Sequence, residues 1–325
     1  MKKLIALLLS VLLITACFAA CGKKADAPDT PADDSGKLNV VCSIFPQYDF
    51  IKTIAGYAVN LTLLLDSKTD LHSYTPTADD IMTISKADLF INIGGESDDW
   101  AEDVLSSAAN DKLHVVSLLK LVDAVEEETL PGMQEEEEEH EEAEHEEDGP
   151  EYDEHVWTSL KNVIQIIPAL TDVLCELDSG NTALYQANSS AYLAQLQTLE
   201  TKYSDTIGKA ARKTLLFADR FPFRYLADDY GLTCYAAFAG CSAETEASFE
   251  TMTFLVDTVK QQNLPFVLMI DGSDGSVAET VSRQSGAEIR TLNSCQSVSP
   301  DDIAAGASYL TIMENNLAVL SEVLN

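Results

Sequence analysis

Short apolar segments alternate with amphipathic segments along most of the chain, and the first half shows this pattern clearly. Four apolar runs there predict buried strands, at 38–43, 59–65, 88–94 and 113–117. Segments between them predict helices, at 45–55, 77–86 and 98–108. Strands that alternate with helices in this way predict a parallel sheet with helices on both faces.

The second half repeats the alternation and predicts a second lobe of the same class. Its strands are predicted at 214–218, 233–238, 265–270 and 288–292. Its helices are predicted at 223–230, 249–262, 277–285 and 303–324.

A long helix is predicted between the two halves. An amphipathic helix at 159–177 is followed by 182–211, where apolar residues recur at three- and four-residue spacing. This second helix would span roughly 45 Å at 1.5 Å per residue, far enough to join two lobes. We therefore predict an α/β protein with two lobes, each with a parallel β-sheet flanked by helices, joined by one long rigid helix. The predicted domains are an N-terminal lobe, a linking helix and a C-terminal lobe, at 37–181, 182–212 and 213–325.

The N-terminus predicts export from the cytoplasm. Lys2 and Lys3 precede an apolar run at 4–14, which is too short to span a bilayer and is typical of a signal peptide. We place this signal peptide at 1–20, and a plain secretory signal cut nearby is the simplest alternative.

The end of this leader predicts a lipid anchor. The segment FAACGKK resembles the lipobox of bacterial lipoproteins, whose cysteine becomes the lipidated first residue. Cys21 is the predicted lipidation site because a polar segment follows it at once, and Cys17 is the alternative. Residues 21–36 are rich in proline, aspartate and alanine, which predicts a flexible tether. The expected location is outside the cell, anchored to the outer face of the bacterial cytoplasmic membrane.

The charge of the chain excludes some partners and favours others. The formal net charge is -34. Binding to nucleic acid or to an anionic membrane surface requires lysine and arginine, so neither is expected. Cations are the natural counterpart of a surface with this charge.

Much of the negative charge lies in one segment, at 126–150. It is a low-complexity run of mostly glutamate, into which His140 and His145 are set. A run of carboxylates cannot bury enough apolar surface to become ordered, so we expect a disordered loop. Acidic tracts with histidine can gather divalent cations loosely. If this loop only buffered cations, the protein would have many weak sites and no tight one.

Two histidines outside this loop are candidate metal ligands. His72 follows the predicted strand at 59–65, and ligands bind at the carboxyl ends of the strands in such sheets. Thr77 and Asp80 predict a capping box that opens the next helix. His155 stands directly before Val156 and Trp157, which we expect to fix its ring and shield it from water.

These two histidine segments carry a family resemblance. LHSYTPTADDI around His72 and EYDEHVWTSLKNV around His155 resemble the ligand segments of the zinc and manganese substrate-binding lipoproteins of bacterial ABC transporters. The resemblance implies a binding protein that captures Zn²⁺, with Mn²⁺ as the second choice, and delivers it to an ABC permease and its ATPase. We expect a monomer. An enzyme is not expected, because the chain has no HExxH motif and no arrangement of nucleophile and base.

The resemblance leaves the remaining ligands open. Arg220 occupies the family's third ligand position, and a guanidinium does not bind a cation. Asp219 is therefore a candidate substitute, and Asp271 and Asp274 are candidates for the fourth, acidic position. Glutamates 244 and 246 rank lower. Because the imidazoles must be neutral to bind, we expect metal affinity to fall as the pH drops toward about 6.5.

A different binding class is the main alternative. Arg220 and Arg224, with the aromatic residues at 221, 223 and 225, could hold an organic anion beside a degenerate metal site.

The cysteines predict one disulfide. Five cysteines follow the leader, and an exported protein can form disulfides. We predict a bridge between Cys241 and Cys295, which both lie in predicted loops that follow strands. Cys42 is expected to be a buried free thiol, and the absence of any CxxC pair disfavours a thiolate zinc site.

Overall fold

The structure is a computed structural model. It describes residues 36–65, 71–107, 110–134, 151–242, 246–296 and 298–325. All helices and strands described below belong to one compact unit, Leu38–Asn325. The predicted signal peptide, Cys21 and nearly all of the predicted tether lie outside the described residues.

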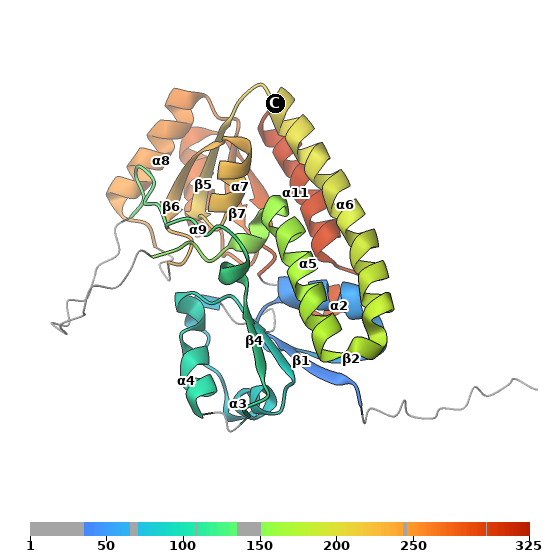
Figure 1. Cartoon of the computed structure of the whole chain (residues 1–325). Coiled ribbons are helices and arrows are strands. Elements are labelled where there is room, and N and C mark those ends of the chain that lie inside the picture. The colour runs from blue at the N-terminus through green and yellow to red at the C-terminus, as the bar shows by residue number, and fades with distance from the viewer. Residues whose placement is uncertain (1–35, 66–70, 108–109, 135–150, 243–245, 297) are drawn as a thin grey trace, which may run out of the picture. The chain divides into compact units, whose positions relative to one another are not determined.

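The N-terminal lobe is built on a parallel four-stranded sheet in the order β2-β1-β3-β4 (Figure 1). Its strands are β1 (Leu38–Cys42), β2 (Val59–Leu63), β3 (Leu89–Asn92) and β4 (His114–Ser117). Its helices are α2 (Phe45–Ala55), α3 (Ala78–Ser85) and α4 (Trp100–Ser107). The central strand β3 is buried along its whole length, as expected for a strand covered on both faces.

The C-terminal lobe repeats this architecture, with a parallel sheet in the order β6-β5-β7-β8. Its strands are β5 (Thr214–Arg220), β6 (Thr233–Phe238), β7 (Phe266–Ile270) and β8 (Glu288–Leu292). Its helices are α7 (Arg224–Tyr230), α8 (Phe249–Gln262), α9 (Ser276–Ser285), α10 (Pro300–Ala304) and α11 (Tyr309–Val323).

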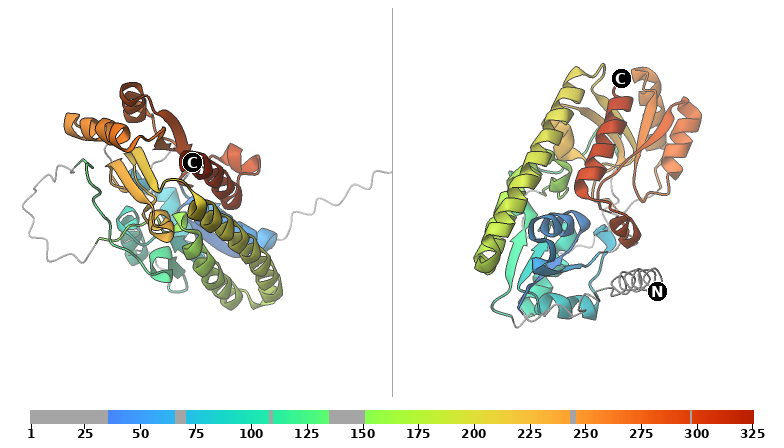
Figure 2. Two further views of the ribbon diagram at one scale, coloured as in Figure 1. Left: turned by 90° about the horizontal axis from the view of Figure 1, so that it is seen from above. Right: turned by 90° about the vertical axis from the view of Figure 1, so that its right-hand side faces the viewer.

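Helix α6 (Thr182–Lys209) runs past both lobes, and α5 (Leu160–Leu177) packs beside it (Figure 2). Near its start, Asn188 donates a hydrogen bond of 3.0 Å to the Ile54 carbonyl in α2. Near its end, the Tyr203 hydroxyl donates one of 2.7 Å to the Met313 carbonyl in α11. The helix is therefore fastened to both lobes, as expected for a rigid linker.

The largest apolar cluster continues from one lobe into the other. Tyr309 at the start of α11 is fully buried and packs edge-on against Phe50 of α2, with ring centroids 5.1 Å apart. The Tyr309 hydroxyl also donates a hydrogen bond of 2.7 Å to the Trp157 carbonyl. These contacts lie directly behind the segment that carries His155, so the core supports that residue from both lobes.

The fold class predicted from the sequence is confirmed, and the bounds of two helices differ. The predicted terminal helix at 303–324 is interrupted at Gly306, whose φ of 99° lies in the left-handed region, and α11 starts afresh with Ser308 as its cap. The linking helix ends at Lys209 instead of 212.

The beginning of the predicted acidic loop is ordered. Glu126 pairs with Tyr152 in an antiparallel bridge, and the Gln134 amide donates a hydrogen bond of 2.9 Å to the Ala237 carbonyl. Residues 135–150, including His140 and His145, lie outside the described residues. Among the helices that the structure describes, none has both the length and the apolar composition needed to cross a bilayer.

Candidate metal centre

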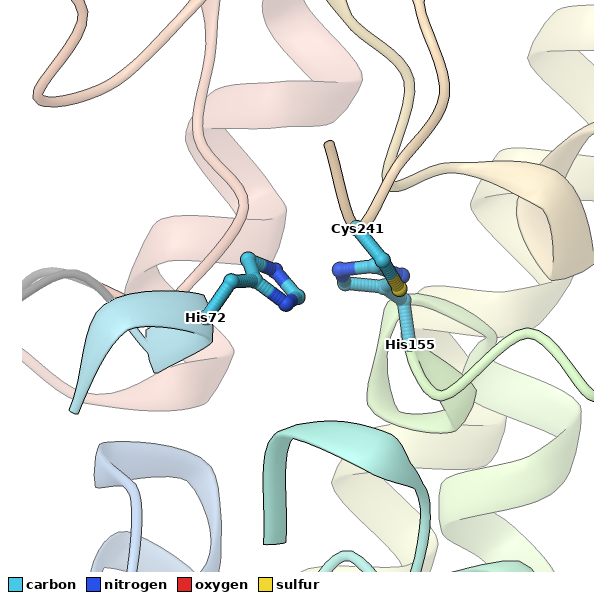
Figure 3. A group of neighbouring side chains, drawn as sticks. All are labelled: His72, His155 and Cys241. Carbon is cyan, nitrogen blue, oxygen red and sulfur yellow. The ribbon is translucent and has the colours of Figure 1, made fainter. Parts of the chain in front are cut away.

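Three side chains that could bind a metal converge from separate parts of the chain: His72, His155 and Cys241 (Figure 3). One ligand atom from each lies within 4.8 Å of the other two. The two imidazole rings have centroids 5.6 Å apart. His155 is fully buried, and the other two are half-buried.

His72 is positioned by the turn that follows β2. It lies in a short 3-10 turn, Leu71–Ser73, and Tyr74 behind it donates a hydrogen bond of 2.9 Å to Asp80. The predicted capping box is present, because the Thr77 amide donates to Asp80 at 2.8 Å and the Asp80 amide donates to the Thr77 hydroxyl at 3.2 Å. One carboxylate therefore begins α3 and holds the turn that presents His72.

His155 is positioned by Asp153. One oxygen of Asp153 accepts hydrogen bonds from the His155 backbone amide at 2.8 Å and from its ring Nδ1 at 3.1 Å. A proton on Nδ1 leaves Nε2 as the basic nitrogen. Nε2 is buried and has no hydrogen-bond partner among the described residues. This ring is oriented as metal-binding histidines are, with one nitrogen held by a carboxylate and the other available.

Trp157 encloses the same imidazole. Its ring centroid lies 5.4 Å from that of His155, and it is fully buried. Its indole N–H donates a hydrogen bond of 2.8 Å to the Ser294 carbonyl, which locks the ring in place. The packing role expected for Trp157 agrees with these contacts.

The surroundings of His155 are negative. Burial lowers its pKa, but the charges of Asp153, Glu154 and Glu127 together with the Asp153 hydrogen bond raise it further, so the net shift is upward. Burial raises the pKa of Glu154 to about 7, and it raises the pKa of Glu127 as well. Buried carboxylates around an imidazole favour a cation at this position.

Cys241 is presented by a turn at the carboxyl end of β6. Gly240 packs so tightly against His155 that a Cβ there would lie 2.9 Å from Cε1 of the ring and 3.0 Å from the Phe221 carbonyl oxygen. Burial raises the pKa of Glu127, and the nearby backbone N–H groups of Cys241 and Gly240 act in the opposite direction. Burial raises the pKa of the Cys241 thiol well above its usual range, with nearby carboxylates adding to the shift.

The aspartates predicted as further ligands lie outside the cluster of three, and each accepts backbone hydrogen bonds. Asp219 accepts hydrogen bonds from the amides of Arg220 at 2.8 Å and Ile270 at 3.1 Å, which ties two strands together. Asp274 is exposed and accepts the Ser276 amide at 2.8 Å at the start of α9. Asp271 accepts the Ser294 amide. None of the three belongs to the described cluster, and neither does the exposed Glu246.

The predicted disulfide is absent, because Cys241 and Cys295 are both free thiols in the structure. Cys295 is fully buried in the main apolar core, whereas the sulfur of Cys241 is grouped with the two imidazoles. This pairing was wrong for a physical reason: two loops that follow strands of one sheet need not place their side chains face to face. Cys42 is a buried free thiol, as predicted.

The structure does not favour the organic-anion alternative. Nη1 of Arg220 donates a hydrogen bond of 3.3 Å to the Ser242 carbonyl. Arg224 pairs with Glu128 and lies 3.4 Å from Asp228. The guanidinium groups of both arginines therefore interact with other groups of the protein. The aromatic residues beside them, at 221, 223 and 225, are buried in the apolar core.

The chemistry of the cluster suits zinc. Two imidazole nitrogens and a sulfur are preferred ligands of Zn²⁺, whereas Mn²⁺ prefers oxygen. Ligand atoms of a tetrahedral site with bonds of about 2.0–2.3 Å lie about 3.3–3.8 Å apart. The observed limit of 4.8 Å therefore requires a closure of about 1 Å around the ion.

Sequence reasoning identified His72 and His155 and missed Cys241. Its only signal was a cysteine directly after a glycine, at the carboxyl end of the predicted strand 233–238. That edge of the sheet is where ligands bind in this class of fold.

The sequence of the chain is similar to those of zinc-uptake and zinc-binding proteins. A model of the zinc-uptake complex component A family, periplasmic (ZnuA), matches residues 40–323. The high-affinity zinc uptake system protein ZnuA of Bacillus subtilis is 32% identical over 316 residues, which is 96% of this chain and 96% of that protein. The zinc-binding lipoprotein AdcA of Streptococcus pneumoniae strain R6 is 30% identical over 319 residues, and the chain spans 60% of its length.

Solved structures show the same architecture. The Zn(II)-bound ZnuA-like domain of S. pneumoniae AdcA superposes with a TM-score of 0.72 at 26% identity, over 89% of this chain and 99% of that domain. The metal-dependent lipoprotein YcdH of B. subtilis gives a TM-score of 0.73 at 28% identity, over 89% of this chain and all of that one.

Proposed function

The chain belongs to the ZnuA family of zinc-uptake components, and from this premise we propose that it captures Zn²⁺ outside the cytoplasmic membrane and delivers it to an ABC permease with its ATPase. Members of this family are solute-binding proteins and not enzymes. The name of the B. subtilis relative states zinc uptake. We extend this function to the present chain because His72, His155 and Cys241 form a cluster that could hold the ion.

One observation carries the proposal. Nε2 of His155 is fully buried and without a hydrogen-bond partner among the described residues, yet Asp153 orients its ring toward the cluster. A buried polar atom left unpaired costs about 1–3 kcal/mol. A bound cation would satisfy this nitrogen and balance the carboxylates nearby. The arrangement is therefore that of a site prepared for an ion.

The position of the ligands suggests how a loaded protein could differ from an empty one. His72 belongs to the N-terminal lobe, Cys241 to the C-terminal lobe, and His155 to the segment that leads into α5. An ion held by all three would connect both lobes. We propose that the permease recognises the surface of this connected state.

We also propose, from the sequence, how the protein is anchored and how cations are gathered near its site. Lipidation at Cys21 would keep the protein beside its permease as a monomer on the outer face of the cytoplasmic membrane. The acidic segment with His140 and His145 would gather cations loosely and raise their concentration near the site. Mn²⁺ ranks below Zn²⁺ because the cluster offers nitrogen and sulfur.

A competition titration against a metal-binding dye tests the capture step. Protein without residues 1–20 is stripped of metal and titrated with Zn²⁺ and Mn²⁺, beside the double variant His72→Ala, His155→Ala and a deletion of 135–150. We expect one tight zinc site that survives the deletion and is lost in the double variant. Weak sites that disappear only with the deletion would contradict a central site.

Delivery is tested separately with membrane vesicles that contain the cognate permease and ATPase. ATP-driven zinc uptake should require the wild-type protein and fail with the double histidine variant. Equal uptake with both proteins would show that the cluster plays no part in delivery.

A further inference from the structure

The turn that carries Cys241 is held in place from several directions. Arg220 donates a hydrogen bond of 3.3 Å to the carbonyl of Ser242, the residue after Cys241. Gly240 itself is in close contact with the His155 ring. These contacts fix the backbone of the turn that presents Cys241.

Glu127 joins the turn to the rest of the centre. It lies next to Glu126, which is paired to the strand-like segment at Tyr152, and it interacts electrostatically with His155. Its Oε1 is buried without a hydrogen-bond partner among the described residues. The same carboxylate also interacts electrostatically with Cys241.

Arg220 lies at the end of one strand, and Cys241 follows the neighbouring strand of the same sheet. In the sheet, Arg220 at the end of β5 pairs in register with Phe238 at the end of β6, three residues before Cys241. Both strand ends thus lie on the same edge, and a ligand from either could face the same ion. Arg220 cannot bind a cation, and its guanidinium instead fastens the neighbouring turn.

We propose that Cys241 is the third metal ligand and binds as a thiolate, so that the centre is formed by two nitrogens and one sulfur. This inference rests on the proposed function. When the ion binds, the Sγ–H bond is broken, its proton passes to solvent, and the sulfur lone pair forms the bond to the metal. The independent sign that the cysteine belongs to a site is the ring of His155, which is grouped with this cysteine and whose Nε2 is buried without a hydrogen-bond partner among the described residues.

A thiolate ligand has a consequence for metal selection. Thiolates bind Zn²⁺ strongly and Mn²⁺ poorly, because Mn²⁺ prefers oxygen ligands. Cys241→Ser should therefore lower zinc affinity by about 100-fold or more, exceeding the 10–100-fold loss typical when only a group that orients a ligand is removed. Manganese affinity should change by less than about tenfold, which narrows the discrimination between the two ions.

Cobalt substitution reports the sulfur directly. Co²⁺ bound by a thiolate shows a sulfur-to-metal charge-transfer band in the near ultraviolet, which imidazole ligands do not give. We expect this band in the wild type with one Co²⁺ per protein, and its loss in Cys241→Ser. Cys175→Ser is the matched control, because Cys175 is a free thiol near the end of α5, away from the cluster.

The outcomes separate this inference from the proposed function. If the wild type binds Co²⁺ and Zn²⁺ tightly without the band, or if Cys241→Ser keeps the band, the sulfur is not a ligand although metal capture stands. If the wild type binds neither ion at a single site, both proposals fail. Circular dichroism of the metal-free variants checks that each is folded.

Discussion

The hydrogen bonds of Asp153 are the most direct way to perturb the candidate centre without removing a ligand. The side chain of Asp153 is 3% exposed, and one of its oxygens accepts hydrogen bonds from both the His155 amide at 2.8 Å and ring Nδ1 at 3.1 Å. Asp153→Ala removes both acceptors at once. The ring of His155 then loses the contact that fixes its orientation and its tautomer.

The expected loss can be worked out in two ways. Hydrogen bonds to a charged group contribute about 1.5–3 kcal/mol. Loss of a carboxylate that orients a metal-binding histidine typically lowers metal affinity 10–100-fold, which corresponds to about 1.4–2.7 kcal/mol. The two ranges agree, so we predict that Asp153→Ala weakens zinc binding 10–100-fold. Asp153→Asn keeps an acceptor oxygen and should fall between this variant and the wild type.

Zinc affinity measured by chelator competition checks this prediction, with Asp172→Ala on the exposed face of α5 as the matched control. The pH profile adds a second readout. Because the charge of Asp153 helps to raise the pKa of His155, both Asp153 variants should keep their reduced affinity to lower pH than the wild type. Unchanged affinity in Asp153→Ala would refute the orienting role of the hydrogen bonds.

Three further predictions follow from the same structure. Gly240→Ala should lower zinc affinity about tenfold or more in the same titration, because the added methyl group would lie 2.9 Å from Cε1 of His155. In the wild type, zinc affinity should fall as the pH drops through a value above 6.5, since the pKa of His155 is raised and the ion competes with its proton, and calorimetry at stepped pH measures this. Burial raises the pKa of Asp49 from 3.8 to about 6, so this residue should cost stability as pH rises through about 6. Asp49→Asn should therefore be about 1–3 kcal/mol more stable than the wild type at pH 7.5 and about equal to it at pH 4, as measured by urea unfolding.

Most of the fold could be predicted from the sequence because its signals are local. Parallel strands buried on both faces are continuous apolar runs, as β3 is, and a helix as long as α6 shows its periodicity over many turns. The break between α10 and α11 was missed because it depends on the left-handed φ of Gly306. A single glycine in an alanine-rich segment is not enough to predict that conformation.

The candidate site was predictable only where its residues carry local features. His72 precedes a capping box, and His155 precedes a tryptophan that packs on it. Cys241 has no such feature, because its place beside the imidazoles depends on how the second lobe meets the first. Asp219 appeared suitable as a ligand, but its oxygens satisfy the backbone amides of Arg220 and Ile270.

Crystals of the zinc-loaded protein, measured on both sides of the zinc absorption edge, would test the central claim most directly. The account predicts one anomalous peak within bonding distance of His72, His155 and Cys241, with full occupancy at one equivalent of zinc. A peak on Asp271 or Asp274 instead, or no ordered peak near His155, would contradict it.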